Sequence, residues 1–194
     1  MPRKARKAPG GIVFHCINRG VGRNRLFHKP QDYAAFERVM AYALEAVPVR
    51  LLAYCLMPNH WHLLLWPEEK GQVGKIHAPA DDDPHTPIPG ALPRSGTRAP
   101  LSEPALSEVE WGRFKSFPVQ EDRHFLTVAR YVERNALRAG LAQRAEQWPW
   151  GSLWRRTNPG ARLSADADGA KAIERCGLPL SPWPVRGRLI IFNG

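Results

Sequence analysis

Two apolar stretches separated by only two residues constrain this chain more than any other feature. Residues 49–57 and 60–66 are apolar or aromatic apart from one arginine and two histidines, and a Pro-Asn pair at 58–59 lies between them. Short apolar runs joined by turn-forming residues are typical of a β-hairpin. The sequence therefore predicts two antiparallel strands in this region.

The second strand of this hairpin contains His60 and His62. Successive side chains of an extended strand point to opposite faces, so the two histidines share one face and Trp61 takes the other. Two neutral imidazole rings on one face are suitable ligands for a divalent metal ion. Such a pair is also common on solvated strands that bind nothing, so it needs support from elsewhere in the chain.

The segments before the hairpin predict a strand and a helix. Residues 12–18 are rich in β-branched and aromatic side chains, and a basic loop with two glycines follows at 19–25. From Asp32 the apolar residues recur at spacings of three and four, until Pro48 ends the pattern. A strand, a helix and a hairpin form the first half of a ferredoxin-like α+β layer.

A long polar stretch interrupts this pattern at residues 71–110. Seven prolines lie between positions 79 and 104, together with an acidic run. Such a segment buries too little apolar surface to offset its ordering entropy, so we expect a long disordered insert. Regular structure should resume with a strand over 112–119 and a helix over 121–139 that stops at Gly140.

We therefore expect an α+β fold: a ferredoxin-like antiparallel sheet with helices on one face, interrupted by a disordered insert. Residues 1–70 form the first half of this domain and residues 71–110 the proline-rich insert. Residues 111–154 form the second half with the last helix, and residues 155–194 an irregular C-terminal tail.

The charge of the chain points to nucleic acid. The formal net charge is +10, and residues 1–30 contain eight Lys and Arg residues but no acidic residue. A basic block of this kind attracts polyanions. The three cysteines form no C-x-x-C pair, and no run of 18 apolar residues occurs. We therefore expect a cytoplasmic, nucleoid-associated protein that does not enter a membrane.

The last predicted helix offers a partner for the histidine pair. Tyr131 and Asn135 lie four residues apart, hence one turn apart on one face. The Asn135 carbonyl oxygen is a candidate third metal ligand, and the Tyr131 phenol a candidate nucleophile toward a coordinated phosphate. Tyrosine has a pKa near 10, and a divalent cation favours the phenolate and stabilises the charge of the transition state. The product would be a phosphotyrosine ester, which conserves the bond energy for rejoining.

Several motifs in order resemble one family. The stretches HCINRGVGRNRLFH, LLAYCLMPNHWHLLL, GRFKSFPVQED and ARYVERNALRAGL are similar to those of the REP-associated tyrosine transposases. These belong to the HUH class of single-strand DNA transposases, in which U denotes a hydrophobic residue. The resemblance covers roughly residues 10–70 and 111–154.

The resemblance implies a metal-dependent transposase. His60, His62 and Asn135 would bind Mg²⁺ or Mn²⁺, and Tyr131 would be the nucleophile. The substrate would be single-stranded DNA near hairpin-forming repeats, cleaved through a 5′-phosphotyrosine intermediate. Relatives include monomers and homodimers, so both states remain open. The candidates for contacts with the DNA are Arg19, Arg23, Arg25, Arg113 and Lys115, for each of which a solvated surface charge is the alternative.

The insert is the main departure from this family, in which the segment after the hairpin forms a helix that packs on the sheet. Without that helix, apolar surface of the sheet would be left uncovered. A catalytically decayed copy that acts only as a hairpin-binding protein is therefore the leading alternative. A metal-dependent nuclease or a basic RNA-binding protein ranks last, because neither has an obvious use for the Tyr131–Asn135 pair.

Overall fold

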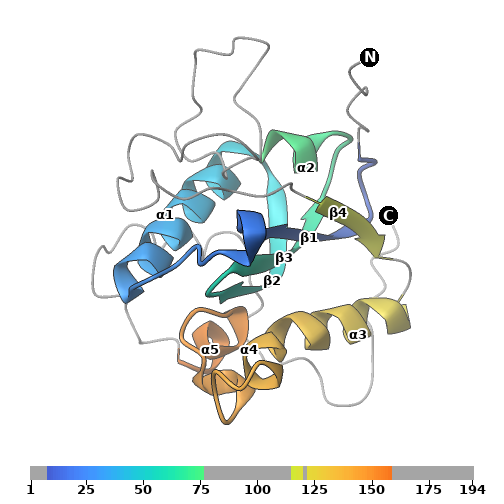
Figure 1. Ribbon diagram of the computed structural model, residues 1–194. Helices are drawn as coiled ribbons and strands as arrows, with labels where there is room; N and C mark the ends of the chain where they lie inside the picture. The colour runs from blue at the N-terminus through green and yellow to red at the C-terminus, as the bar shows by residue number, and fades with distance from the viewer. Residues whose placement is uncertain (1–7, 77–114, 120–121, 159–194) are drawn as a thin grey trace, which may run out of the picture.

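The computed structural model describes residues 8–76, 115–119 and 122–158 (Figure 1). These residues form four strands, five α-helices and two short 3₁₀ helices. In chain order they are β1 (Val13–Arg19), η1 (Val21–Arg23), α1 (Pro30–Ala46), β2 (Val49–Met57), β3 (His60–Pro67), α2 (Gln72–Lys75), β4 (Lys115–Val119), α3 (Asp122–Glu133), α4 (Asn135–Arg138), η3 (Ala145–Gln147) and α5 (Ser152–Thr157).

The four strands form one sheet in the order β2-β3-β1-β4, and every neighbouring pair is antiparallel. This is the strand order of a ferredoxin-like sheet, so the α+β class and the antiparallel sheet are confirmed. The predicted hairpin is β2 and β3, with Met57 opposite His60 across the turn.

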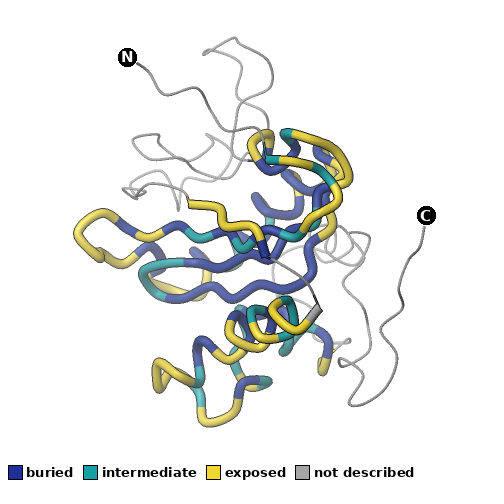
Figure 2. Tube along the Cα trace, turned by 90° about the vertical axis from the view of Figure 1, so that its right-hand side faces the viewer, coloured by how far each residue is buried: buried dark blue, intermediate teal, exposed yellow. Residues whose placement is uncertain are grey.

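Helices cover both faces of the sheet, which corrects the expectation of helices on one face. One apolar cluster packs α1 and α2 against one face, and a second packs α3 and α4 against the other. Figure 2 shows buried strands with a helix packed below them. The physical reason is that β2 and β3 are buried along nearly their whole length. A strand with apolar residues on both sides needs a covering layer on each.

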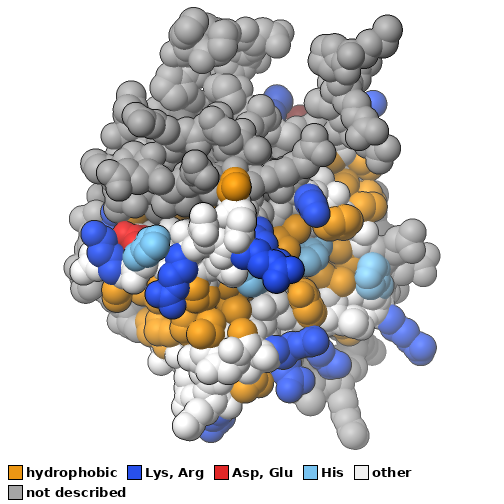
Figure 3. All heavy atoms as spheres, viewed as in Figure 1, with side chains coloured by type: hydrophobic (Ala, Val, Ile, Leu, Met, Phe, Trp, Pro, Cys, Tyr) orange, Lys and Arg blue, Asp and Glu red, His pale blue; other side chains and the backbone are white. Residues whose placement is uncertain are grey.

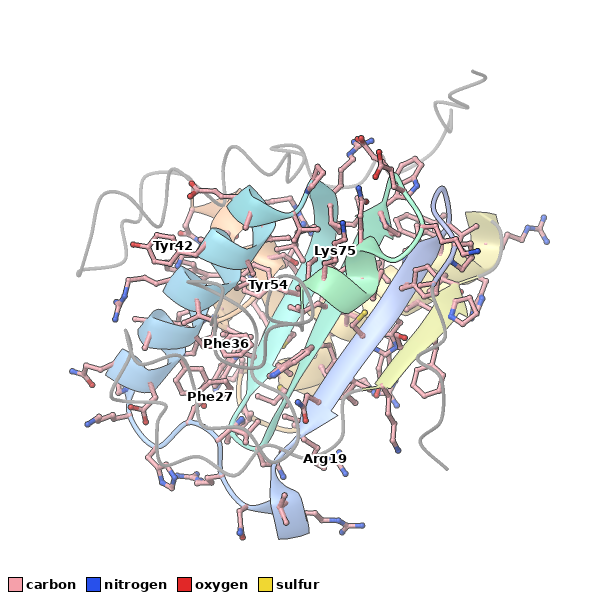
Figure 4. All side chains as sticks on the ribbon, turned by 90° about the horizontal axis from the view of Figure 1, so that it is seen from above. Arg19, Phe27, Phe36, Tyr42, Tyr54 and Lys75 are labelled. Atoms are coloured by element: carbon pink, nitrogen blue, oxygen red, sulfur yellow. The ribbon has the colours of Figure 1, made fainter. Side chains whose placement is uncertain are left out.

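The α1 face contains the larger aromatic core. Phe27 and Phe36 stand between α1 and the strands (Figure 4), with their ring centroids 5.5 Å apart. Val73 and Ile76, from α2 and the residue after it, are buried in the same cluster. The apolar side chains on this face of the sheet, such as Leu63 of β3, are buried too. Within residues 8–76, 115–119 and 122–158, the sheet face that we expected to be uncovered is therefore covered.

Several element boundaries differ from the predictions. Helix α1 begins at Pro30, because the Asp32 carboxylate accepts the backbone N–H groups of His28 and Lys29 at 2.8 and 3.1 Å. The single helix predicted over 121–139 is divided at Arg134 into α3 and α4. Gly140 ends it as predicted, with a φ of 69°.

The predicted insert and tail fall mostly outside the described residues. Within 71–110, the structure places α2 and describes nothing beyond residue 76. Residues 112–114 of the predicted fourth strand also lie outside the described part, as do residues 159–194. Helix α5 crosses residue 154, where the second half of the domain was expected to end. Across the described ranges, no helix is long and apolar enough to span a membrane.

Helix α5 is tied to α1 and α3 by ion pairs, and to β2 by a hydrogen bond from the Tyr54 backbone N–H to the Ser152 hydroxyl at 3.1 Å. Arg155 forms an ion pair with Glu37 of α1 at 2.6 Å, and the Tyr54 hydroxyl of β2 donates to the same carboxylate at 2.7 Å. Arg156 forms a buried ion pair with Glu133, the last residue of α3. The end of α3 is therefore held in place through α5.

Candidate metal and nucleophile site

Sheet register brings the histidines of β3 alongside polar side chains of β1. Arg19 lies directly opposite His60, and Ile17 directly opposite His62. Residues opposite each other on paired antiparallel strands point to the same face. This face is the one covered by α3 and α4, since Leu64, two residues after His62, packs in the cluster that contains Ala129 and Ala136. The prediction that His60 and His62 share a face is confirmed.

The turn before His60 is held by the loop that follows β1. The backbone N–H of Gly20 donates to the Asn59 carbonyl at 2.9 Å, and that of Leu26 donates to Pro58 at 2.7 Å. A Cβ on Gly20 would lie only 2.3 Å from the Asn24 carbonyl oxygen, so this close approach requires glycine. The start of β3 is thereby fixed relative to β1.

Asn59 also selects which ring nitrogen of His60 carries the proton. Its Oδ1 lies 2.7 Å from Nδ1 of His60. An amide oxygen only accepts, so Nδ1–H must be the donor in this contact. In the neutral ring the lone pair then lies on Nε2, the atom available to a metal ion.

His62 is almost fully buried, at 1% exposure, and both of its ring nitrogens have partners. Nε2 of His15, from β1, lies 2.9 Å from Nδ1 of His62. Nδ2 of Asn135 lies 3.1 Å from Nε2 of His62. The structure therefore brings together the predicted ligands His62 and Asn135, which are 73 residues apart in the chain.

Tyr131 stands over the histidines. Its ring centroid lies 5.6 Å from that of His62 and 6.1 Å from that of His15, in edge-on arrangements. The side chain remains 39% exposed, so it can be reached from solvent. The Arg138 guanidinium lies 5.3 Å from the centroid of the Tyr131 ring, within cation–π range.

The environment favours the neutral form of all three histidines. Burial, followed by the nearby charges of His60, His15 and Arg19, lowers the pKa of His62 to about 2. Burial and the Arg19 charge lower the pKa of His60 to about 4. Burial also lowers the pKa of His15. Metal binding requires neutral imidazole, so these side chains are in the form that a metal ion would need at pH 7.

The donor set fits a divalent metal of the Mg²⁺ or Mn²⁺ type. His60 and His62 supply imidazole nitrogens 4.9 Å apart between ring centroids, and Asn135 supplies an amide beside His62. Among the residues that the structure describes, no group of three His, Cys, Asp or Glu side chains is arranged to hold a metal. Asn135 is the candidate third ligand of another type; its Nδ2 faces His62, and its Oδ1 would face a metal ion there once the amide turned over.

The predicted DNA-binding residues occupy different places. Arg19 is exposed beside His60, and Lys115 of β4 is exposed opposite Ile17, on the histidine face. Arg23 and Arg25 are exposed in and after η1, and the Arg23 carbonyl accepts the Asn59 amide at 3.3 Å. Figure 3 shows basic side chains next to histidines on this side of the molecule. Arg113 lies outside the described residues.

Sequence reasoning did not assign a role to His15 or Asn59. His15 shares a strand face with Ile17 and Arg19 by simple alternation, so the sequence contained a signal. Its contact with His62 depends on the pairing register of β1 and β3, which no local pattern specifies. Asn59 was predicted only as a turn residue.

Comparisons with known proteins support the fold. No protein-family model and no curated protein matches this chain. A solved structure of a REP-associated tyrosine transposase bound to a REP hairpin is similar, with a TM-score of 0.54 and 16% sequence identity. The similarity covers 98% of this chain and 99% of the other. The structural similarity shows that the two chains share a fold, and a sequence identity of 16% shows nothing beyond the fold.

Proposed function

We propose that this protein is a metal-dependent transposase that cleaves and rejoins single-stranded DNA near hairpins through Tyr131. One observation carries the proposal: a phenol, a buried neutral imidazole and an amide converge from separate elements. The Tyr131 ring lies 5.6 Å from that of His62, and the Asn135 amide lies 3.1 Å from the same imidazole. The similar structure is that of a transposase bound to a REP hairpin, which supports hairpin DNA as the substrate.

The chain's own residues supply the parts that the reaction needs. His60, His62 and Asn135 would hold Mg²⁺ or Mn²⁺, which when bound supplies positive charge beside the scissile phosphate. Asn59 holds the proton of His60 on Nδ1 and keeps its Nε2 free. The Arg138 guanidinium over the Tyr131 ring places a second positive charge next to the attacking group.

The strand-transfer step is a phosphoryl substitution. The Tyr131 hydroxyl oxygen forms a bond to phosphorus while the bond between phosphorus and the 3′ oxygen breaks. The phenol releases its proton to solvent, and the departing 3′ oxygen takes one up. The 5′-phosphotyrosine ester keeps the energy of the broken bond, so a 3′ hydroxyl can reverse the step without a nucleotide cofactor.

Basic side chains around the site suit a DNA backbone. Arg19 and Lys115 are exposed on the histidine face, and Arg138 lies beside the nucleophile. Each phosphate that such a group neutralises releases counterions, so binding should weaken as salt is raised.

The test is a covalent-adduct assay with Mn²⁺ and labelled single-stranded hairpin oligonucleotides, read by denaturing gel and intact-protein mass. We expect wild-type protein to become covalently attached to DNA. Tyr131→Phe should lose the adduct while its hairpin affinity stays within about twofold, because one hydroxyl contributes little to a largely electrostatic interface. Tyr42→Phe is a matched control, since Tyr42 is an exposed tyrosine on α1 (Figure 4).

Three outcomes would contradict parts of the proposal. Adducts formed by Tyr131→Phe would show that another residue is the nucleophile. Wild-type protein that binds hairpins in Mn²⁺ without attachment would favour the non-catalytic hairpin-binding alternative. Cleavage that leaves free ends on both sides of the cut would indicate a nuclease.

A further inference from the structure

His15 of β1 is part of the histidine cluster but not of the proposed ligand set. Its ring stacks on that of His62, with centroids 5.1 Å apart and planes 20° apart. Its Nε2 lies 2.9 Å from Nδ1 of His62. Both neighbours opposite His15 in the sheet, Leu64 and Phe117, are apolar. His62 is therefore the polar partner that the sheet offers to this ring.

The contacts of His62 define where its proton lies. Asn135 approaches Nε2 with Nδ2, and an amide nitrogen is a donor without acceptor capacity. Nε2 must therefore accept and cannot itself carry the proton. A neutral imidazole has one N–H, so Nδ1 of His62 carries it and donates to Nε2 of His15.

We propose that His15 is a positioning residue that holds the proton of His62 on Nδ1 and thereby keeps the lone pair on Nε2, which Asn135 Nδ2 contacts in the metal-free chain and a metal ion would take in its place. The metal-binding part of this inference rests on the proposed function, whereas the position of the proton does not. A ligand histidine whose other ring nitrogen donates to a fixed acceptor is held in one tautomer and one ring orientation.

The same arrangement occurs at the other histidine of β3. Asn59 Oδ1 accepts from Nδ1 of His60, as His15 Nε2 accepts from Nδ1 of His62. Both rings therefore keep their lone pair on Nε2. The two acceptors come from different elements, a turn and a neighbouring strand, yet they select the same tautomer.

The primary test measures the tautomer of His62 by ring ¹⁵N NMR on metal-free protein. In the wild type we expect a protonated Nδ1 and an unprotonated Nε2. His15→Phe keeps a planar ring but removes the acceptor of the buried Nδ1–H. The His62 proton should then move to Nε2, with the Asn135 amide turned so that its Oδ1 accepts it. His15→Gln restores a side-chain acceptor and should restore the wild-type signals. His28→Phe makes the same substitution at an exposed histidine and is the control for the loss of one histidine from the spectrum.

The second measurement is Mn²⁺ affinity by isothermal titration calorimetry. Loss of an outer hydrogen-bond partner typically weakens metal binding about 10–100-fold, which we expect for His15→Phe. His15→Gln should recover most of that loss, a rescue that a merely space-filling role would not give.

Each outcome bears on the inference. Wild-type protein with the His62 proton on Nε2 would overturn it without any variant, even if His15→Phe fails to fold. An unchanged tautomer in folded His15→Phe would also overturn it. A wild type that shows the expected tautomer but binds no Mn²⁺ would support the role of His15 in holding the proton, while the proposed metal-dependent function would fail.

Discussion

Acidification should destabilise the metal-free protein through its buried histidines. The pKa of His62 is about 2 in the folded chain against an ordinary value of 6.5. A histidine with a depressed folded pKa contributes stability that is present above the unfolded pKa and lost as the pH falls toward the folded pKa. The loss therefore begins near pH 6.5 and continues through the whole range in which the native state persists.

The magnitude follows from the size of the shift. Between pH 6.5 and 5 the unfolded chain binds a proton at His62 that the folded chain excludes, at about 1.36 kcal/mol per pH unit. His62 alone should therefore lower the free energy of unfolding by about 2 kcal/mol at pH 5. His60, whose pKa falls to about 4, adds a smaller share because it is partly exposed and solvent screens its interactions.

The assay is urea unfolding at pH 7 and pH 5 in EDTA, for wild-type protein and His62→Asn. Burial raises the pKa of Glu37, so protonation of this carboxyl stabilises the folded protein as the pH falls. This effect has the opposite sign to that of the buried histidines. The comparison with the variant isolates His62. We expect the loss between pH 7 and 5 to shrink by about 2 kcal/mol in His62→Asn. Equal losses in the wild type and His62→Asn would refute the reasoning.

Two further predictions concern the end of α3 and the DNA-binding face. Glu133→Ala leaves the buried Arg156 guanidinium without its carboxylate and should lower the free energy of unfolding by about 3–5 kcal/mol. Glu146→Ala removes an exposed ion pair and should change the free energy of unfolding little. Equal effects of the two variants in chemical denaturation would show that the Arg156–Glu133 pair does not hold the end of α3. Arg19→Gln should reduce the slope of log affinity for single-stranded DNA against log salt by about 0.7, whereas Lys70→Gln, at an exposed position between β3 and α2, should not. Unchanged slopes for both variants would remove Arg19 from the interface.

The parts of the fold that could be predicted are those set by local pattern. The bounds of β2 were obtained at both ends because a Pro precedes it and a Pro-Asn turn follows it. The shared face of His60 and His62 follows from strand alternation alone. The Tyr131–Asn135 pair follows from helical spacing, and helical hydrogen bonds continue on both sides of Arg134: its backbone N–H donates to the Arg130 carbonyl, and its carbonyl accepts from the N–H of Arg138.

The parts that could not be predicted depend on contacts between distant segments. Helix α5 has only six residues and no clear periodicity, and buried ion pairs to Glu37 and Glu133 hold it in place. Helices lie on both faces because β2 and β3 are buried on both sides. These strands show little alternation of apolar and polar residues, so the sequence alone does not indicate how many of their faces are covered. His15 is a candidate only after the β1–β3 register places it next to His62.

The position of the departure from the transposase pattern also bears on the alternative of a decayed enzyme. The segment between Ile76 and Lys115 connects the end of α2 to β4, a strand at the edge of the sheet. Strands β1 and β3, which hold the histidines, pair without it, and α3 packs on β2 and β3 through Ala129 and Val132. The entropy of closing a connection grows only with the logarithm of its length, about 0.6 kcal/mol per doubling. A long connection at this place is therefore compatible with an intact site, and the adduct assay is a direct measure of whether the chemistry survives.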